Sequence, residues 1–369
     1  MKDKQIKKAS LGKVLGIFVL RLLAMAGTFV VAVAVLLLLT LNMFCSDSFP
    51  HVQQTFVTTI LETGQLKFLA SWFMSPEEIQ KVVDQNSMET FNVEINTELI
   101  QKGSFGKVDI QTGDAKVTEE EETEEIEIIE VAGATYTGTM MIVKDPSRIS
   151  LATIYPWKEK GVTLDKLVKD NGAIAGINGG LYDSTDNTGG KPYGVIVSNG
   201  EIQHNKPREY RGLVLIGFTE DDILQIIDIS DKSEKDIEEL VAEMKIRDAV
   251  TFQEEASDAN NHFVQLIING EAREMNGMGS GLNPRTAIGQ RADGAVLMFV
   301  TDGRGKSGHL GASGADLIEV MQEFDAVNAA NLDGGSSSCM YYNDEYLMTS
   351  VTFYYADSSW RLPAGFIVK

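Results

Sequence analysis

The fold of this chain is decided by residues 326–338, AVNAANLDGGSSS, where a run of small apolar residues ends in a polar, glycine-rich segment. Side chains alternate along a strand with a period of two, so Asn331 and Asp333 point to the same side if the strand continues that far. Gly334 and Gly335 follow at once and expose backbone N–H groups that suit an anion. The stretch therefore predicts a strand that ends at a polar site.

A second stretch has the same form. Residues 173–182, AIAGINGGLY, read as a buried strand that ends on Asn178. Gly179 and Gly180 come next and leave the backbone unhindered, so a ligand can approach it closely there. A tight turn explains these two glycines equally well.

Charged residues enter two further apolar strands. Residues 296–304, VLMFVTDGR, end in Asp302 and Arg304 on either side of a glycine. Residues 283–289, NPRTAIG, place Arg285 among small and apolar neighbours. A guanidinium in such a place needs a carboxylate or phosphate partner, because its charge is costly to bury unpaired. The partner of Arg285 is either a bound anion or the carboxylate of a structural salt bridge.

The sequence around these stretches predicts an α+β domain over residues 126–369. Short β-rich runs are separated by glycines and by the hairpin dipeptides Asn199-Gly200 and Asn269-Gly270. Ser233 and Ser313 each precede an aspartate by three residues and then an apolar helical pattern, which indicates two capping boxes. We expect a mixed, β-rich sheet domain with a few helices and find no fixed-period repeat.

The N-terminal region predicts a membrane anchor. Residues 22–46 are uncharged over about 25 positions, and a span needs about 20. A signal peptide is the alternative, but its apolar region usually has about 7–15 residues and ends in small residues, unlike the sequence up to Cys45. Lysines precede the run and Asp47 follows it, so we expect a single pass in the cell membrane with a cytoplasmic N-terminus and an extracellular C-terminal domain.

The region between anchor and domain predicts a stalk and an acidic linker. Apolar residues from Phe49 onward have mixed helical spacing, and Ser75 followed by a proline and two glutamates indicates the start of a short helix. The stalk aromatics pack as a helical hairpin, on the membrane surface or on another subunit. Like charges at residues 119–125 indicate a solvated linker. The predicted segments are a basic tail and start of the span at 1–21, the anchor at 22–46, the stalk at 47–118, the linker at 119–125 and the domain at 126–369.

Composition excludes several classes of function. The formal net charge of -21 opposes nucleic-acid binding. Two cysteines and four histidines do not suggest a disulfide framework or a His-rich zinc site. Residues 183–190, DSTDNTGG, have the oxygen-rich look of a loop for a divalent cation such as calcium but lack EF-hand spacing, so a plain polar loop is the other interpretation. Metal requirement and oligomeric state stay open.

Taken in order, the motifs resemble the phosphodiester glycosidase family. They are Asn178-Gly179-Gly180, Gly194, Asn199-Gly200, Arg285-Thr286-Ala287-Ile288-Gly289, Asp302-Gly303-Arg304 and Asn331-Leu332-Asp333-Gly334-Gly335-Ser336. The family includes the lysosomal uncovering enzyme, which removes N-acetylglucosamine from a phosphodiester on mannose, and many bacterial exported proteins. The resemblance covers residues 126–369 and leaves out the anchor, the stalk and the linker.

The resemblance implies hydrolysis of a sugar-1-phosphodiester at its glycosidic bond. In that reaction Arg285 holds the phosphodiester charge, which grows on the leaving phosphate. Asp333 is the candidate carboxylate that acts at the anomeric carbon or on a water, and Asp302 is the second carboxylate or the group that orients Arg285. The expected substrate-binding residues are Asn178, Gly179, Gly180, Arg304, Asn331, Gly334, Gly335 and Ser336, with the two asparagines bonded to sugar hydroxyls or to an N-acetyl group.

Two other functions are compatible with the sequence. The same domain serves as a noncatalytic glycan-binding or scaffold protein of the cell envelope, or the glycine runs are turns of a structural membrane protein. The natural substrate also stays open, since wall teichoic acid, capsule, exopolysaccharide and phosphoglycolipid all carry sugar phosphates outside the membrane.

Overall fold

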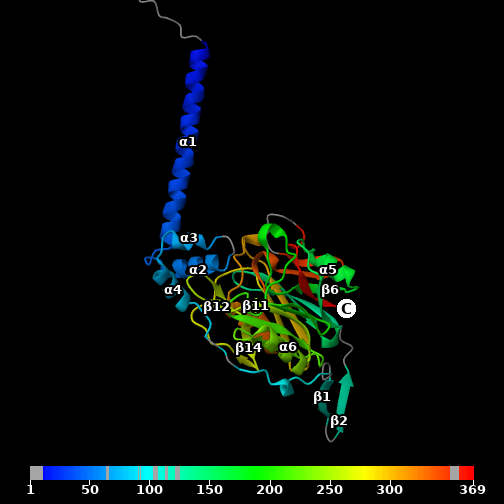
Figure 1. Cartoon of the computed structure of the whole chain (residues 1–369). Helices are drawn as coiled ribbons and strands as arrows, with labels where there is room; N and C mark the ends of the chain where they lie inside the picture. Colours follow the sequence, from blue (N-terminus) through cyan, green and yellow to red (C-terminus); the bar gives the residue numbers. More distant parts are fainter. Residues whose placement is uncertain are drawn as a thin grey trace, which may run out of the picture.

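A computed structural model describes residues 11–63, 66–89, 91, 93–102, 107–112, 115–120, 125–349 and 357–369. One long helix, α1 (Leu11–Phe44), projects from a body of short helices and sheets (Figure 1). α1 has 34 residues, which at about 1.5 Å per residue exceeds the roughly 30 Å hydrocarbon core of a bilayer. Most of its apolar side chains are exposed, so α1 has the length and composition shared by membrane anchors and signal sequences.

Three short helices pack against one another at the end of α1. Their shared core contains Val57, Ile60, Ile79 and Val83, together with Cys45 from the turn after α1. The predicted helix start at Ser75 is confirmed, with a complete capping box. The described helices after α1 are α2 (Pro50–Leu61), α3 (Phe68–Ser71), α4 (Pro76–Asp84), α5 (Leu164–Asp170), α6 (Glu234–Glu243) and α7 (Gly314–Glu323), with 3₁₀ turns at Thr97–Leu99, Pro146–Arg148, Thr185–Asn187, Lys306–Gly308 and Gly335–Ser337.

The body is built from antiparallel sheets. Its largest sheet has seven strands in the order β15-β14-β18-β16-β17-β4-β3, and two five-stranded sheets have the orders β10-β9-β11-β7-β8 and β20-β19-β6-β21-β5. The strands are β1 (Lys107–Thr112), β2 (Ala115–Glu120), β3 (Ile126–Ala132), β4 (Thr137–Val143), β5 (Ile149–Thr153), β6 (Ala175–Asn178), β7 (Val195–Ser198), β8 (Glu201–Asn205), β9 (Leu213–Thr219), β10 (Leu224–Asp228), β11 (Ile246–Gln253), β12 (Glu255–Ala256), β13 (Asn261–His262), β14 (Gln265–Ile268), β15 (Glu271–Ala272), β16 (Thr286–Arg291), β17 (Val296–Thr301), β18 (Ala326–Asn331), β19 (Cys339–Tyr342), β20 (Glu345–Thr349) and β21 (Ala364–Val368). The predicted mixed α+β class is confirmed.

The hairpin turns and helix caps predicted from the sequence are confirmed. Asn199-Gly200 and Asn269-Gly270 form the turns of the β7-β8 and β14-β15 hairpins, with positive φ at all four residues. Ser233 and Ser313 cap α6 and α7. The acidic run falls partly in β2, whose last two residues are glutamates, and residues 121–124 lie outside the described residues.

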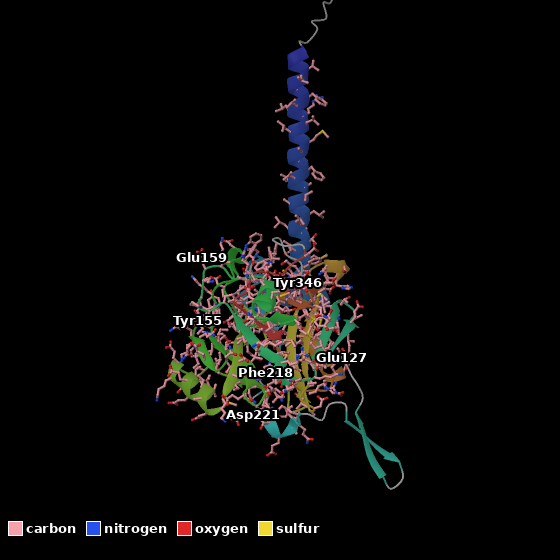
Figure 2. The ribbon with its side chains drawn as sticks, turned by 90° about the vertical axis from the view of Figure 1, so that its right-hand side faces the viewer. Glu127, Tyr155, Glu159, Phe218, Asp221 and Tyr346 are labelled. Atoms are coloured by element: carbon pink, nitrogen blue, oxygen red, sulfur yellow. The ribbon has the colours of Figure 1, made fainter. Side chains whose placement is uncertain are left out.

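The three large sheets enclose one apolar core. Phe218 of β9 meets Phe366 of β21 edge to face, with ring centroids 6.1 Å apart, and Met298 of β17 belongs to the same cluster. Figure 2 shows Phe218 within the body, with α1 standing clear of it. α7 packs on the outer face of the seven-stranded sheet, where Leu317 and Met321 are buried. This packing fixes the ends of β6, β16, β17 and β18, which carry the predicted site residues.

Candidate active site

The amide of Asn178 ties three chain segments together at the end of β6. Its Nδ2 donates to the Asp333 carbonyl oxygen at 2.6 Å. Its Oδ1 accepts from Thr286 Oγ1 at 2.8 Å and from the Cys339 N–H at 3.1 Å. Asn178 is fully buried. Its amide therefore holds the start of β16 and the segment around Asp333 in fixed positions.

Asp333 lies in a packed polar environment just beyond β18. Its Oδ1 accepts from the Gly334 N–H at 3.0 Å. Burial raises its pKa to about 7, although hydrogen bonds from Ser337 and Gly334 and the charge of Arg304 oppose the shift. Part of its surface stays accessible. A carboxyl group with a pKa near 7 can exchange a proton at neutral pH, as acid–base catalysis requires.

Arg304 lies against the glycine-rich turn that follows Asp333. Its Nη1 donates to Ser336 Oγ at 2.8 Å. Gly335 has a φ of 63°, which favours glycine, and a Cβ there would lie 2.5 Å from Arg304 Nη2, so another residue would also displace the guanidinium. Arg304 Nε is buried without a hydrogen-bond partner among the described residues. Burial, reinforced by Arg285, lowers the pKa of Arg304.

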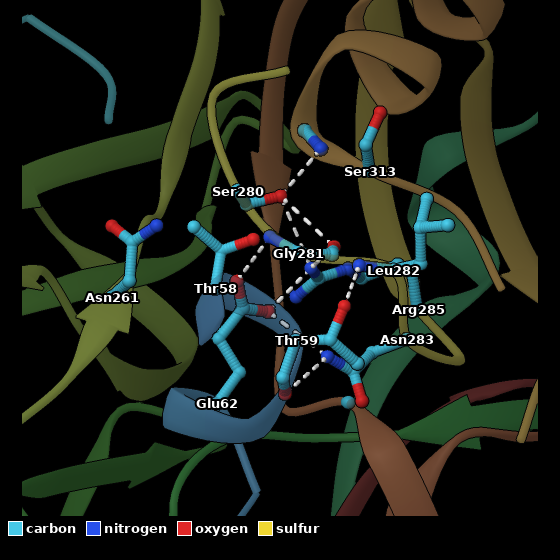
Figure 3. Close-up of polar contacts among 12 residues, drawn as sticks. Thr58, Thr59, Glu62, Asn261, Ser280, Gly281, Leu282, Asn283, Arg285 and Ser313 are labelled. Atoms are coloured by element: carbon cyan, nitrogen blue, oxygen red, sulfur yellow. Dashed lines mark hydrogen bonds and ion pairs between the residues drawn. The ribbon is translucent and has the colours of Figure 1, made fainter. Parts of the chain in front are cut away.

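Arg285 is buried directly before β16. Its Nε donates to the Ala312 carbonyl at 3.1 Å, and its Nη2 donates to the Gly281 carbonyl at 2.6 Å and to Ser280 Oγ at 3.1 Å (Figure 3). The guanidinium carbon lies 4.9 Å from the centre of the Phe263 ring. These contacts fix the orientation of the guanidinium plane.

The carboxylate partner of Arg285 is Glu62, the residue that follows α2. The two side chains form a buried ion pair, with side-chain exposures of 7% and 3%. Glu62 Oε1 also accepts from the Gly281 N–H at 2.6 Å, and Oε2 lies 3.3 Å from Asn283 Nδ2 (Figure 3). Burial raises the pKa of the Glu62 carboxyl, although Arg285 opposes the shift. A carboxylate thus occupies an anion site made by a guanidinium, a backbone N–H and an amide.

The neighbouring residue Thr59 fastens the same segment to the body. Its Oγ1 accepts from the Leu282 N–H at 3.0 Å, and its carbonyl lies 3.4 Å from Asn283 Nδ2. The end of α2 therefore contacts the loop before β16 through both backbone and side chains.

Asp302 has a different partner from the one considered in the sequence. Its Oδ2 lies 2.7 Å from His309 Nδ1, and its Oδ1 accepts from the Thr137 N–H at 2.8 Å. The carboxylate that orients Arg285 is Glu62, so Asp302 orients His309 instead.

The remaining predicted residues have structural contacts. Asn331 Nδ2 donates to the Phe263 carbonyl at 2.9 Å, while its Oδ1 is buried without a partner among the described residues. A Cβ on Gly180 would lie 2.2 Å from the Thr251 carbonyl, and one on Gly179 would lie 3.1 Å from that of Ala364. The two glycines thus allow close packing of strands.

A cleft of about 500 Å³ lies near this charged group, although Asp333, Arg304 and Arg285 are not among its lining residues. Tyr182 lines the cleft, and its hydroxyl lies 2.9 Å from Ser337 Oγ. His262 also lines it, and burial lowers the His262 pKa to about 4, with Arg285 adding to the shift. Tyr193 and Tyr210, whose ring centroids are 4.9 Å apart, supply flat apolar faces. Such walls suit a sugar ring, and the polar groups suit its hydroxyls.

Sequence comparison identifies the family of this domain. The family profile described as "Phosphodiester glycosidase" matches residues 171–369, more than half of the chain. The chain belongs to the phosphodiester glycosidase family. The resemblance stated from the motifs is confirmed.

The individual relatives of this chain are distant. The N-acetylglucosamine-1-phosphodiester alpha-N-acetylglucosaminidase of Mus musculus is 32% identical over 82 residues, which cover 22% of this chain and 15% of the mouse protein. The zebrafish catalytic domain of that enzyme, described as auto-inhibited by its pro-peptide, is 20% identical, with a TM-score of 0.49, over 67% of this chain and 84% of that structure. A Burkholderia pseudomallei protein described as exported is 14% identical, with a TM-score of 0.42, over 63% and 74%.

The glycosidase domain brings most of the predicted residues into one neighbourhood. Asp333 and Arg304 lie together, and Arg285 and Glu62 are close enough to shift the Arg304 pKa. Sequence reasoning did not find Glu62, Thr59 or the cleft residue His262. Glu62 lies outside the family resemblance, and the only signal was that Arg285 needed an anionic partner.

The raised pKa of Asp333 predicts a pH-dependent stability for the glycosidase domain. Its pKa is about 7 in the folded chain and about 3.9 in an unfolded chain. Between these values the folded state holds a proton that the unfolded state releases, so this contribution to stability is lost as pH rises. Thermal melting should therefore show Asp333→Asn gaining stability relative to the native chain from about pH 4 to about pH 7. Melting curves that stay parallel across this range would contradict the assigned pKa.

The described residues offer no group of three or more His, Cys, Asp and Glu side chains arranged to hold a metal ion. Asp183, Ser184 and Thr185 of the oxygen-rich loop line the cleft.

Proposed function

We propose that the domain hydrolyses the glycosidic bond of a sugar-1-phosphodiester in an envelope or extracellular glycan. One observation carries the proposal: Asp333, with a pKa of about 7, shares one charged group with Arg304 and Arg285. A cleft of about 500 Å³ reaches this group through Tyr182, whose hydroxyl contacts Ser337. A carboxyl group with two cations nearby suits a reaction in which negative charge grows on a leaving phosphate.

In the proposed reaction the bond between the anomeric carbon and the phosphate oxygen breaks. The electron pair leaves with that oxygen, and Arg285 and Arg304 stabilise the resulting phosphomonoester. The oxygen of water ends on the anomeric carbon, and its protons pass to solvent or to the released phosphate. Asp333 attacks the anomeric carbon or takes the proton of the attacking water. Asn178 positions Asp333 by donating a hydrogen bond to the Asp333 carbonyl oxygen. Asp302 is the second carboxylate of the proposal, and it acts by holding His309 in place.

We propose that the described form of the site is closed to substrate phosphate. Glu62 fills the anion position in front of Arg285 and uses the Gly281 N–H and the Asn283 amide as well. A substrate phosphate needs the same donors, so the segment from Thr59 to Glu62 must move before the phosphate binds.

We also propose that α1 anchors the chain in the cell membrane as a single pass, with the N-terminus cytoplasmic and the domain outside. The length and exposed apolar surface of α1 support this. A Phe29→Trp reporter near the middle of α1 tests it, because its fluorescence should be quenched by lipids brominated near the ends of their acyl chains. A reporter that stays unquenched in reconstituted protein contradicts the anchor.

The activity is tested with sugar-1-(nitrophenyl phosphates) of several sugars. Glycosidic cleavage releases nitrophenyl phosphate, which gains colour only after a phosphatase is added. In ¹⁸O-labelled water the label should enter the sugar and not the phosphate. Colour without phosphatase, or label in the phosphate, would identify cleavage at phosphorus and overturn the proposal. Saturable binding without turnover in both the native chain and Glu62→Gln would support the alternative function, a noncatalytic glycan-binding protein.

Arg285→Lys should weaken phosphate recognition and turnover together. Lysine keeps the charge but loses the planar fork that meets Ser280, Gly281 and Ala312, so we expect a loss of about 1–3 kcal/mol in transition-state stabilisation. Steady-state kinetics measures it. Arg208→Lys, at an exposed arginine, is the control. A folded Arg285→Lys with native kcat/KM would reduce Arg285 to a structural role.

A further inference from the structure

An exposed apolar surface lies at the end of α1, on the loop and helix that follow α2. Leu66, Phe68 and Trp72 expose 48%, 45% and 62% of their surface. The rings of Phe68 and Trp72 meet edge to face with centroids 5.0 Å apart. We call these three residues the aromatic foot. Single exposed apolar residues are common, but three large ones together mark an interaction surface.

The foot is held in a fixed place relative to α1. Phe44, the last residue of α1, packs its ring 5.3 Å from that of Phe56 in α2. Gln53 Nε2 donates to the Cys45 carbonyl at 2.9 Å, and Cys45 is buried in the core of the short helices. Figure 1 shows α3, which carries Phe68, beside the lower end of α1.

Hydrogen bonds also hold the short helices against the body, which limits how far the foot can move relative to the domain. Asn261 Nδ2 donates to the Asn86 carbonyl at 3.0 Å, and Asn276 Nδ2 donates to the Asp84 carbonyl at 3.1 Å. These two bonds hold the end of α4 and do not use Glu62, so they still join the short helices to the domain when the segment from Thr59 to Glu62 moves.

We propose that the aromatic foot inserts into the interfacial layer of the same bilayer that α1 crosses. This rests on the membrane anchor proposed above. Aromatic side chains favour the membrane–water interface, where α1 ends. The formal net charge of -21 disfavours attraction to anionic lipids, so insertion depends on apolar and aromatic contact. Lys67, between Leu66 and Phe68, lines the cleft and lies 3.0 Å from Asn260 Oδ1, so the seated foot places the rim of the cleft at the membrane surface.

Tryptophan quenching in the reconstituted full chain tests this inference. The chain has three tryptophans, and Trp157→Phe with Trp360→Phe leaves only Trp72. In phosphatidylcholine nanodiscs its emission should shift to shorter wavelength and be lost more strongly to lipids brominated near the headgroup than to those brominated near the chain ends. If that double variant fails to fold, the difference between the native chain and Trp72→Phe gives the same reading.

The controls separate this inference from the anchor. A chain with Phe29→Trp and the three native tryptophans changed to Phe reports insertion of α1. Deep quenching of that reporter with no quenching of Trp72 overturns the foot, whether or not the Trp72 emission shifts to shorter wavelength. If neither tryptophan is quenched, the anchor fails and the foot fails with it.

Discussion

Asp333→Asn is expected to lower turnover of a sugar-1-phosphodiester by about 100-fold or more while leaving substrate binding nearly unchanged. Asparagine keeps the volume of the side chain and its bond from the Gly334 N–H, but it removes the charge and the proton-accepting group. Single-turnover kinetics isolates the chemical step from binding. It is measured in the Glu62→Gln background, where Glu62 no longer competes for the phosphate position.

One control variant and one folding check make the Asp333→Asn result specific. Asp325→Asn changes an exposed aspartate after α7 at a positive φ that asparagine also tolerates, and it should leave turnover native. Both variants must show cooperative melting before their rates are compared. Near-native turnover in folded Asp333→Asn would remove Asp333 from the chemistry and make Asp302, with His309, the leading candidate.

Glu62→Gln is expected to raise kcat/KM on a soluble sugar-1-phosphodiester by about 10-fold or more. The apparent affinity of a substrate falls with the fraction of chains in the open form, so weakening the closed form strengthens apparent binding. Glutamine keeps the shape of the side chain but loses the charge that pairs with Arg285. The gain should appear mainly in KM, because the open chain has the same catalytic groups.

The controls for Glu62→Gln address stability and charge. Removing one partner of a buried ion pair costs about 3–5 kcal/mol in the free energy of unfolding, so folding is checked first. Glu77→Gln, at an exposed glutamate in the first turn of α4, removes one charge from the same bundle and should change neither KM nor kcat. A loss of turnover in folded Glu62→Gln would make Glu62 a participant in the reaction rather than an occupant of the phosphate position.

Local patterns predict the parts of this fold that depend on neighbours in the chain. The serine caps of α6 and α7 bond residues three positions away, and the Asn-Gly turns need positive φ at two adjacent residues. The order of the glycine-rich motifs along the chain predicts the family, and most of these motifs lie next to strand ends. The apolar run around Phe29 likewise predicts the exposed surface of α1.

These local patterns do not reveal which side chains pair when they lie far apart in the sequence. Arg285 needs an anion by its burial alone, but Glu62 lies 223 residues earlier, in a region without family resemblance. Asp302 directly follows β17 and Arg285 directly precedes the adjacent strand β16, yet Asp302 contacts His309 and not Arg285. Sequence motifs mark Asn178 as a site residue, while only the packed strands show that its amide is used by three protein groups.

The position of β21 has a consequence for the order of events during synthesis. This strand lies between β6 and β5, and Phe366 fills the centre of the main core. Both neighbours leave the ribosome long before residues 364–368 exist, and until then neither has the partner that joins them. The growing domain therefore cannot close this sheet until β21 has been made. In the exported chain that we propose, this late closure keeps the sheet open while the domain is threaded across the membrane.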